Sequence, residues 1–113
     1  MTHTITRTAE QEEYTSQKHN LFLVRDVVTA ATNPYLSLHR GRVEPSGEIV
    51  CHRQEHTVTV YILSGDVLCT VEKKETRLGA GCCVVIAAGV ERGFKNCGEQ
   101  PVELLIVVTP PQC

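Results

Sequence analysis

The stretch CHRQEHTVTVYILSG, at residues 51–65, decides the fold. It carries two of the five histidines of the chain, His52 and His56, with Gln54 between them, and it continues into an apolar run that stops at a Ser-Gly-Asp turn. Side chains at every second position of a strand lie on one face of the sheet. We therefore expect His52, Gln54 and His56 to lie side by side at one end of a β-strand.

Short apolar runs of strand length recur along the rest of the chain, and residues typical of turns separate them. They occupy residues 21–28, 36–43, 58–63, 67–72, 82–86 and 102–109. The residues Glu44-Pro45-Ser46-Gly47 predict a turn after the second run. No long segment has an apolar period of 3.6 residues, so helices are not expected. Many short strands at even spacing predict an all-β, antiparallel sandwich or barrel.

The first 20 residues are polar and have no apolar period. We interpret residues 1–20 as a polar N-terminal arm and residues 21–113 as one barrel domain, because a chain of 113 residues favours a single domain. The six cysteines contain no C-x-x-C pair, which favours reduced thiols over a disulfide framework.

Composition narrows the classes of partner. The net charge is −2 and 42% of the residues are hydrophobic, which indicates a globular protein without the basic footprint of a nucleic-acid binder. The longest uncharged, largely apolar run, residues 78–90, is too short to span a bilayer. The first residues contain no apolar core of a secretory signal. We expect a cytoplasmic protein with neither nucleic acid nor membrane as a partner.

Two motifs occur in this sequence. The first consists of Gly47, His52, Gln54, Val58 and Gly65. The second consists of Gly81, Ala87, Gly89, Arg92 and Asn96. In their spacing these motifs resemble those of the small single-domain cupins, the RmlC-like jelly-roll barrels of cupin-2 type. The resemblance covers residues 21–110 and implies an antiparallel double-stranded β-helix. It also implies a homodimer, which would cover an exposed strand edge such as that of residues 21–28.

The resemblance also implies a metal site, and this sequence departs from it. The family places two histidines and a glutamate in the first motif and a histidine in the second. Those ligand positions hold His52, Gln54, Val58 and Arg92, so only His52 matches. An aliphatic side chain cannot ligate a metal, and arginine is a permanent cation. We therefore predict a degenerate metal site without a cofactor. The alternative is a divalent transition metal held by His52, Gln54 and His56.

The family includes dioxygenases, isomerases, epimerases, decarboxylases, cyclases and simple binders, so fold alone does not select a function. We predict a metal-independent isomerase, lyase or cyclase that acts on an anionic or carbonyl-bearing metabolite. His52 would be the acid-base group and His56 would assist it, while Gln54 and Arg92 would bind the substrate. The alternatives are a non-catalytic ligand-binding cupin and an atypical metal-binding cupin, for example a dioxygenase.

Two side chains have an undecided direction at this point. Arg92 either lines the barrel as an anion site or extends to the rim with its stem on Phe94. His39 lies in a predicted strand and faces either the cavity or the outer surface.

Overall fold

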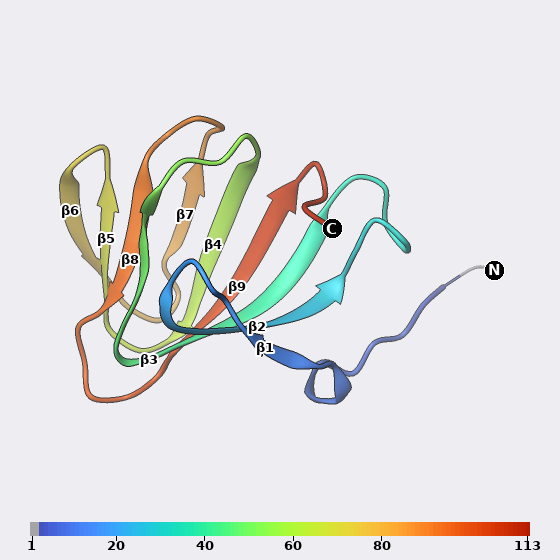
Figure 1. Cartoon of the computed structure of the whole chain (residues 1–113), viewed down its shortest axis with the longest axis horizontal. Coiled ribbons are helices and arrows are strands. Elements are labelled where there is room, and N and C mark those ends of the chain that lie inside the picture. The colour runs from blue at the N-terminus through green and yellow to red at the C-terminus, as the bar shows by residue number, and fades with distance from the viewer. Residues whose placement is uncertain (1–2) are drawn as a thin grey trace.

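A computed structural model describes residues 3–113 (Figure 1). A 3-10 turn, η1, covers Thr8–Glu10. The strands are β1 (Glu13–Thr15), β2 (Asn20–Val28), β3 (Ser37–His52), β4 (Thr57–Ser64), β5 (Val67–Val71), β6 (Lys74–Leu78), β7 (Cys83–Ile86), β8 (Arg92–Asn96) and β9 (Val102–Thr109). Among residues 3–113, no helix is long or apolar enough to cross a membrane.

The strands follow from the alternation of apolar and polar side chains. Along β4, Val58, Val60 and Ile62 are buried, and the residues between them are half-buried or exposed. β5 and β9 repeat this pattern over most of their length. A period of two directs one set of side chains to the interior, so these strands close around a shared apolar core.

All strand pairs are antiparallel, and the sheet curls into a barrel (Figure 1). The order of neighbours is β6-β5-β8-β3-β9-β4-β7, and β2 pairs with both β1 and β3. Strands that are distant in sequence lie next to each other, as in a jelly roll. The predicted all-β double-stranded β-helix is confirmed.

The predicted turn at residues 44–47 is wrong, because β3 runs through it as one strand of 16 residues. The sequence signal marks a bend in the strand. Ser46 has a φ of 69°, and beyond it β3 changes partner from β9 to β8. Proline and glycine are tolerated at such irregularities, where the ladder is interrupted. The bend therefore forms a corner of the barrel.

A β-bulge lies further along the same strand. Ile49 pairs with Phe94 and His52 pairs with Arg92, so two residues of β3 oppose Gly93 alone. A Cβ at Gly93 would lie 2.8 Å from the Cys51 Sγ atom and 2.9 Å from the backbone of Ile49, which explains the glycine. The extra residue reverses the alternation of β3, as bulges do. His52 faces the interior and Cys51 is exposed.

The residues of the predicted arm include two described elements. β1 pairs with β2 at residues 23–25, which covers that part of the edge of β2. The side chain of Arg25 also donates hydrogen bonds to the backbone oxygens of Ala9, at 3.2 Å, and Gln11, at 2.5 Å. Residues 1–2 lie outside the described part. The boundary between arm and barrel, the homodimer and the cytoplasmic location all stay predictions.

Candidate functional site

The barrel encloses a cavity of about 90 Å³, which we call the inner cavity. Its lining residues are Tyr14, Phe22, Val24, His39, Ile49, His52, Gln54, Arg92, Ile106 and Gln112. The polar side chains come from β1, β3, β8 and the segments that follow β3 and β9. The cavity thus combines an apolar floor with several groups that can donate or accept hydrogen bonds, which is typical of a small-ligand site.

His52 and Arg92 lie on the same wall because they are direct partners across the β3–β8 ladder. Residues directly opposite in an antiparallel pair project to the same face. Gln54 follows β3, and its backbone oxygen accepts a 2.8 Å hydrogen bond from the N–H of Gly89. This bond connects the loops that carry the two motifs. It fixes Gln54 beside His52.

The hydrogen bonds of His52 define its protonation. Its Nδ1 atom is 2.7 Å from the oxygen of Val50, which can only accept, so Nδ1 carries the proton. Its Nε2 atom is 3.2 Å from Nε2 of Gln54, which can only donate. His52 is therefore a neutral imidazole whose Nε2 lone pair points at the amide. The Oε1 atom of Gln54 is buried and has no hydrogen-bond partner among residues 3–113.

Burial lowers the pKa of His52, and the hydrogen bond to Val50 acts in the opposite direction. The positive charges of Arg92 and Lys18 lower the pKa further. A neutral imidazole with a depressed pKa suits a general base better than a general acid. An anion bound at Arg92 would offset that cation and raise the pKa of His52 again.

Arg92 is the exceptional charge of the site. Its side chain is 3% exposed, and it forms no ion pair with any acid among the described residues. Its one polar contact in this part of the chain is a long hydrogen bond of 3.4 Å from Nη1 to the oxygen of Val90. Burial lowers the pKa of the guanidinium, although arginine stays a cation. Of the two directions considered from sequence, the structure shows the inward one.

His19 stands behind His52 and takes part in the same arrangement. Their ring centroids are 4.9 Å apart, and the Nδ1 atom of His19 accepts a 2.9 Å hydrogen bond from the N–H of Val50. Burial lowers the pKa of His19 to about 4, with smaller contributions from His52 and the nearby cations. The N–H of Val50 is thus hydrogen-bonded to His19, and its carbonyl oxygen is hydrogen-bonded to His52.

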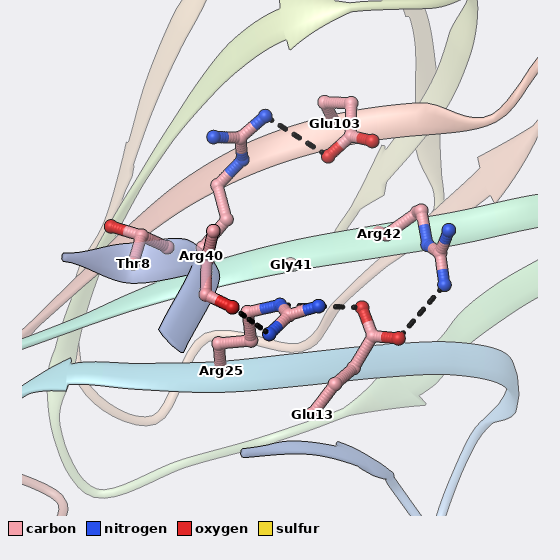
Figure 2. A pocket seen from close by; sticks show the side chains of 8 residues that line it. Thr8, Glu13, Arg25, Arg40, Gly41, Arg42 and Glu103 are labelled. Carbon is pink, nitrogen blue, oxygen red and sulfur yellow. Dashed lines mark hydrogen bonds and ion pairs between the residues drawn. The ribbon is translucent and has the colours of Figure 1, made fainter. Parts of the chain in front are cut away.

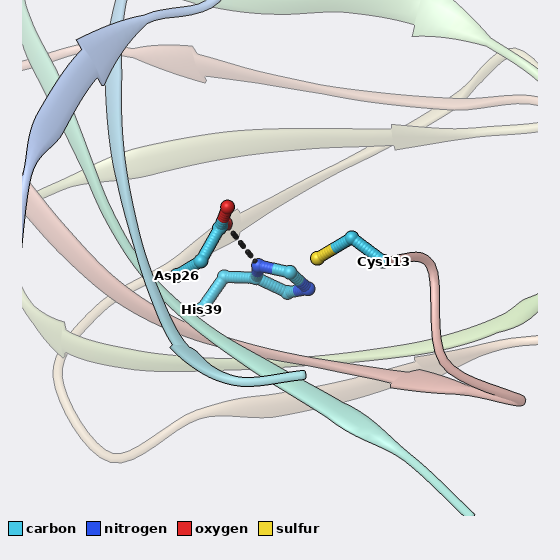
Figure 3. A group of neighbouring side chains, drawn as sticks. All are labelled: Asp26, His39 and Cys113. Carbon is cyan, nitrogen blue, oxygen red and sulfur yellow. Dashed lines mark hydrogen bonds and ion pairs between the residues drawn. The ribbon is translucent and has the colours of Figure 1, made fainter. Parts of the chain in front are cut away.

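His39 faces the inner cavity and belongs to a second polar network (Figure 3). Its Nδ1 atom is 2.8 Å from Oδ1 of Asp26, and its Nε2 atom is 2.9 Å from the hydroxyl of Ser37. Tyr14 donates a 2.7 Å hydrogen bond to the same Asp26 oxygen. Burial and this carboxylate raise the pKa of Tyr14. The Tyr14 hydroxyl therefore stays protonated beside the Asp26 carboxylate.

His56 lies outside the inner cavity, in a shallower hollow of about 490 Å³ that we call the outer recess. The recess shares His52, Gln54 and Gln112 with the inner cavity and adds Lys18, Arg53 and Glu55. The Nδ1–H of His56 donates a 3.0 Å hydrogen bond to the oxygen of Pro110. The structure therefore brings His52, Gln54 and Arg92 together and places His56 at the entrance.

The four family positions for a metal do not fit a divalent ion. Val58 is 4% exposed within the apolar core and offers no donor atom. Arg92 brings a cation to the cavity that His52 and Gln54 line. One imidazole and one amide remain, which is short of the donor set that such ions require.

A larger hollow of about 360 Å³ lies on the outer face of the barrel (Figure 2). Three arginines line it, and each has an acidic partner. Glu13 lies 2.9 Å from Arg42 and 3.7 Å from Arg25, Glu103 lies 3.1 Å from Arg40, and Glu44 lies 3.4 Å from Arg42, so three acids face three arginines. Because these charges are balanced within the chain, we place the candidate site at the inner cavity despite its smaller volume.

Sequence reasoning assigned no role to Tyr14 or His19 and left His39 undecided. A signal for His39 was present, since it shares the parity of Val43, an apolar residue of the same run. Tyr14 and His19 carry no such signal, because they lie in a polar segment without a period. Only the folding of that segment along β2 brings Tyr14 to the cavity and His19 against His52.

Comparison with solved structures agrees with this architecture. The polyketide cyclase RemF from Streptomyces resistomycificus has a TM-score of 0.85 and 17% identity, over 95% of this chain and 79% of that chain. KdgF from Halomonas sp. has a TM-score of 0.85 and 15% identity, over 96% of each chain. A predicted oxalate decarboxylase from Thermotoga maritima has a TM-score of 0.84 and 18% identity, over 95% of this chain and 99% of that chain. At these identities the likeness shows the fold alone.

No curated protein sequence matches the chain. The sequence profile of the Cupin_2 family, described as a cupin domain, matches residues 39–108, which include most of β3, all of β8 and the ladder pair of His52 and Arg92. That match covers more than half of the chain and agrees with the jelly-roll topology. The chain therefore belongs to the Cupin_2 family.

Proposed function

We propose that this cupin domain binds a small anionic metabolite and acts on it, without a metal, as an isomerase, lyase or cyclase. The observation that supports this most is the buried Arg92 guanidinium, which has no acidic partner among residues 3–113 and lies beside a neutral histidine. A buried cation is costly unless an anion pairs with it. A bound carboxylate or phosphate would supply that pair.

The unpaired Oε1 atom of Gln54 narrows the ligand further. A buried acceptor without a partner favours a ligand that donates a hydrogen bond to it. A molecule with an anionic group for Arg92 and a hydroxyl or amino group for Gln54 would satisfy both. The inner cavity has room for only such a head group, and the outer recess, with Lys18 and Arg53, would hold the rest of the molecule.

The chemistry common to the three proposed enzyme classes is proton removal from a carbon next to a carbonyl. The Nε2 atom of His52 would take that proton, after substrate displaces the amide of Gln54. The electron pair of the C–H bond moves to the carbonyl oxygen and forms an enolate, whose negative charge Arg92 would stabilise. RemF, one of the structural neighbours, is a polyketide cyclase, which lies within this range.

Binding can be tested with three probes of similar size. Glycolate carries a carboxylate and a hydroxyl, acetate carries only the carboxylate, and glycolamide is neutral. We expect glycolate to bind most tightly and glycolamide least, as measured by ligand-observed NMR. Arg92→Met should remove the preference for the carboxylates, and Gln54→Leu should remove the difference between glycolate and acetate. Equal binding of all three probes contradicts the proposal.

Catalysis is tested by exchange of the methyl protons of pyruvate in D₂O, followed by NMR. We expect exchange above the buffer rate with the native chain, loss of it in His52→Ala, and retention in Arg7→Met, which changes an exposed arginine that lines neither the inner cavity nor the outer recess.

A second candidate is a non-catalytic binding domain, and one observation favours it. Both ring nitrogens of His52 already have partners, at 2.7 and 3.2 Å, so the base is not free before a ligand enters. Glycolate binding without any pyruvate exchange would support this candidate over the enzyme.

A further inference from the structure

Three side chains that can bind a metal meet on the side of the barrel formed by β2 and β3, and none of them holds one of the four family positions. They are Asp26 on β2, His39 on β3 and Cys113, which follows β9. Their ligand atoms all lie within 4.8 Å of one another. Figure 3 shows the carboxylate and the thiol approaching the imidazole of His39 from different sides. One oxygen, one nitrogen and one sulfur ligand together are a donor set that zinc accepts.

The fold fixes all three positions. Asp26 and His39 are direct partners in the β2–β3 ladder, so their side chains share a face. Cys113 is held through its backbone, because its oxygen accepts a 2.7 Å hydrogen bond from the N–H of Ala30. The preceding N–H, of Gln112, donates a 3.0 Å hydrogen bond to the hydroxyl of Ser37. The thiol is therefore placed by two bonds that do not involve its sulfur.

The local charge also favours a cation. Asp26 has no lysine or arginine within ion-pair distance among the described residues; its acid-base partner there is His39. A divalent ion bound by one carboxylate, one thiolate and one neutral imidazole gives a neutral centre. The opposite holds at the family positions, where Arg92 would add a positive charge to the metal.

The surroundings of His39 suit coordination of a metal ion by its Nδ1 atom. The Nε2 atom lies 2.9 Å from the hydroxyl of Ser37, which can accept the second ring proton. Such a partner on the far nitrogen is usual for metal-binding histidines and fixes the ring. The Nδ1–Oδ1 distance is 2.8 Å, and tetrahedral zinc would need about 3.3 Å, so this pair would open by about half an ångström when the ion binds.

We propose that Asp26, His39 and Cys113 form a zinc site that fastens residues 110–113 to β2 and β3. Its three ligands are residues other than His52 and Arg92, the residues of the proposed chemistry, although His39 lines the same cavity. It would stabilise one side of the inner cavity, since His39 and Gln112 both line that cavity. A water molecule would complete the four ligands of the ion.

The test uses the full chain after treatment with a chelator and titration with Co²⁺, followed by Zn²⁺ competition. We expect one equivalent of Co²⁺ and a thiolate-to-cobalt charge-transfer band in the near ultraviolet, which Zn²⁺ abolishes. Cys113→Ser should remove the band, and Asp26→Asn should weaken binding. Ser37→Ala should weaken it about 10- to 100-fold, as losses of such outer partners do. Zn²⁺ should raise the Tm of the native chain and not that of Cys113→Ser.

Two matched controls separate this site from others. Cys97→Ser changes an exposed cysteine elsewhere and should leave the band intact. His52→Ala should also leave it intact, although it removes the proposed base. A band that survives Cys113→Ser, or one that disappears with His52→Ala, overturns the zinc proposal. Neither result touches the binding of glycolate, which tests the proposed function independently.

Discussion

Replacing Arg92 by methionine should make the unliganded protein more stable and destroy its affinity for anions. The guanidinium is 3% exposed, and its polar contact among residues 3–113 is a single long hydrogen bond to Val90. Methionine has a similar length and fills the same space without a charge. The change therefore removes a desolvated cation that the chain itself does not neutralise.

The size of the effect follows from these contacts. Replacing buried ionic groups by apolar side chains of similar volume stabilises proteins by roughly 1–4 kcal/mol. We expect a gain of about 1–3 kcal/mol for Arg92→Met, because in the native chain the hydrogen bond to Val90 already offsets part of the cost of burying the guanidinium. For a domain of this size that gain corresponds to a rise in Tm of roughly 4–12 °C. Loss of a buried charge partner costs a ligand about 2–5 kcal/mol, which is roughly a 30-fold to several-thousand-fold loss of affinity.

Differential scanning calorimetry without ligand and NMR titration with glycolate measure the two effects. Arg53→Met is the matched control, since Arg53 is 57% exposed at the outer recess and should change stability by less than about 0.5 kcal/mol. A lower Tm for Arg92→Met, together with unchanged glycolate binding, would refute the reasoning. Arg92 would then be a structural residue.

Three further changes test the fold around the site. His19→Asn keeps an acceptor for the N–H of Val50 but cannot titrate. Because the pKa of His19 is about 4 in the folded chain and near 6.5 in the unfolded one, the free energy of unfolding should fall by about 1–2 kcal/mol between pH 6.5 and 4 in urea titrations. The variant should lose the part of this pH dependence that comes from His19 and keep the part that comes from His52. Asn96→Ala leaves the oxygen of Val43 without its 3.0 Å donor and should cost about 1–3 kcal/mol in the same assay, whereas a neutral result shows that another donor replaces it. Gly65→Ala should lower the Tm by several degrees, because φ is +105° and the new Cβ would lie 2.8 Å from β9; an unchanged Tm contradicts the strained turn.

The fold could be predicted from sequence because its determinants are local. Alternation along residues 102–109 gave the bounds of β9, and the glycine of each motif marked a real turn or close approach. The error at residues 44–47 arose because proline and glycine signal a break in the ladder but do not distinguish a turn from a bend. β8 was not predicted as a strand, since a segment of five residues with arginine, glycine and lysine carries no clear alternation.

The site was only partly predictable, for a different reason. Parity placed His52, Gln54 and His56 on one face, but β3 ends at His52, so alternation no longer governs the residues that follow. Gln54 is held at the cavity by its bond to Gly89, whereas His56 turns to the oxygen of Pro110. Contacts of this kind join segments far apart in the sequence. Their partners cannot be deduced from a local pattern.

The bulge opposite Gly93 means that the chemistry of this barrel depends on the number of residues in one strand as well as on their identity. Inserting one residue between Arg92 and Gly93 would give every residue of this part of β3 its own partner, and simple alternation after Ile49 would then turn the imidazole of His52 towards solvent. The barrel could keep its core and lose its site through the insertion of one codon. Such a site can therefore be lost through a change in length that leaves every functional side chain in the sequence.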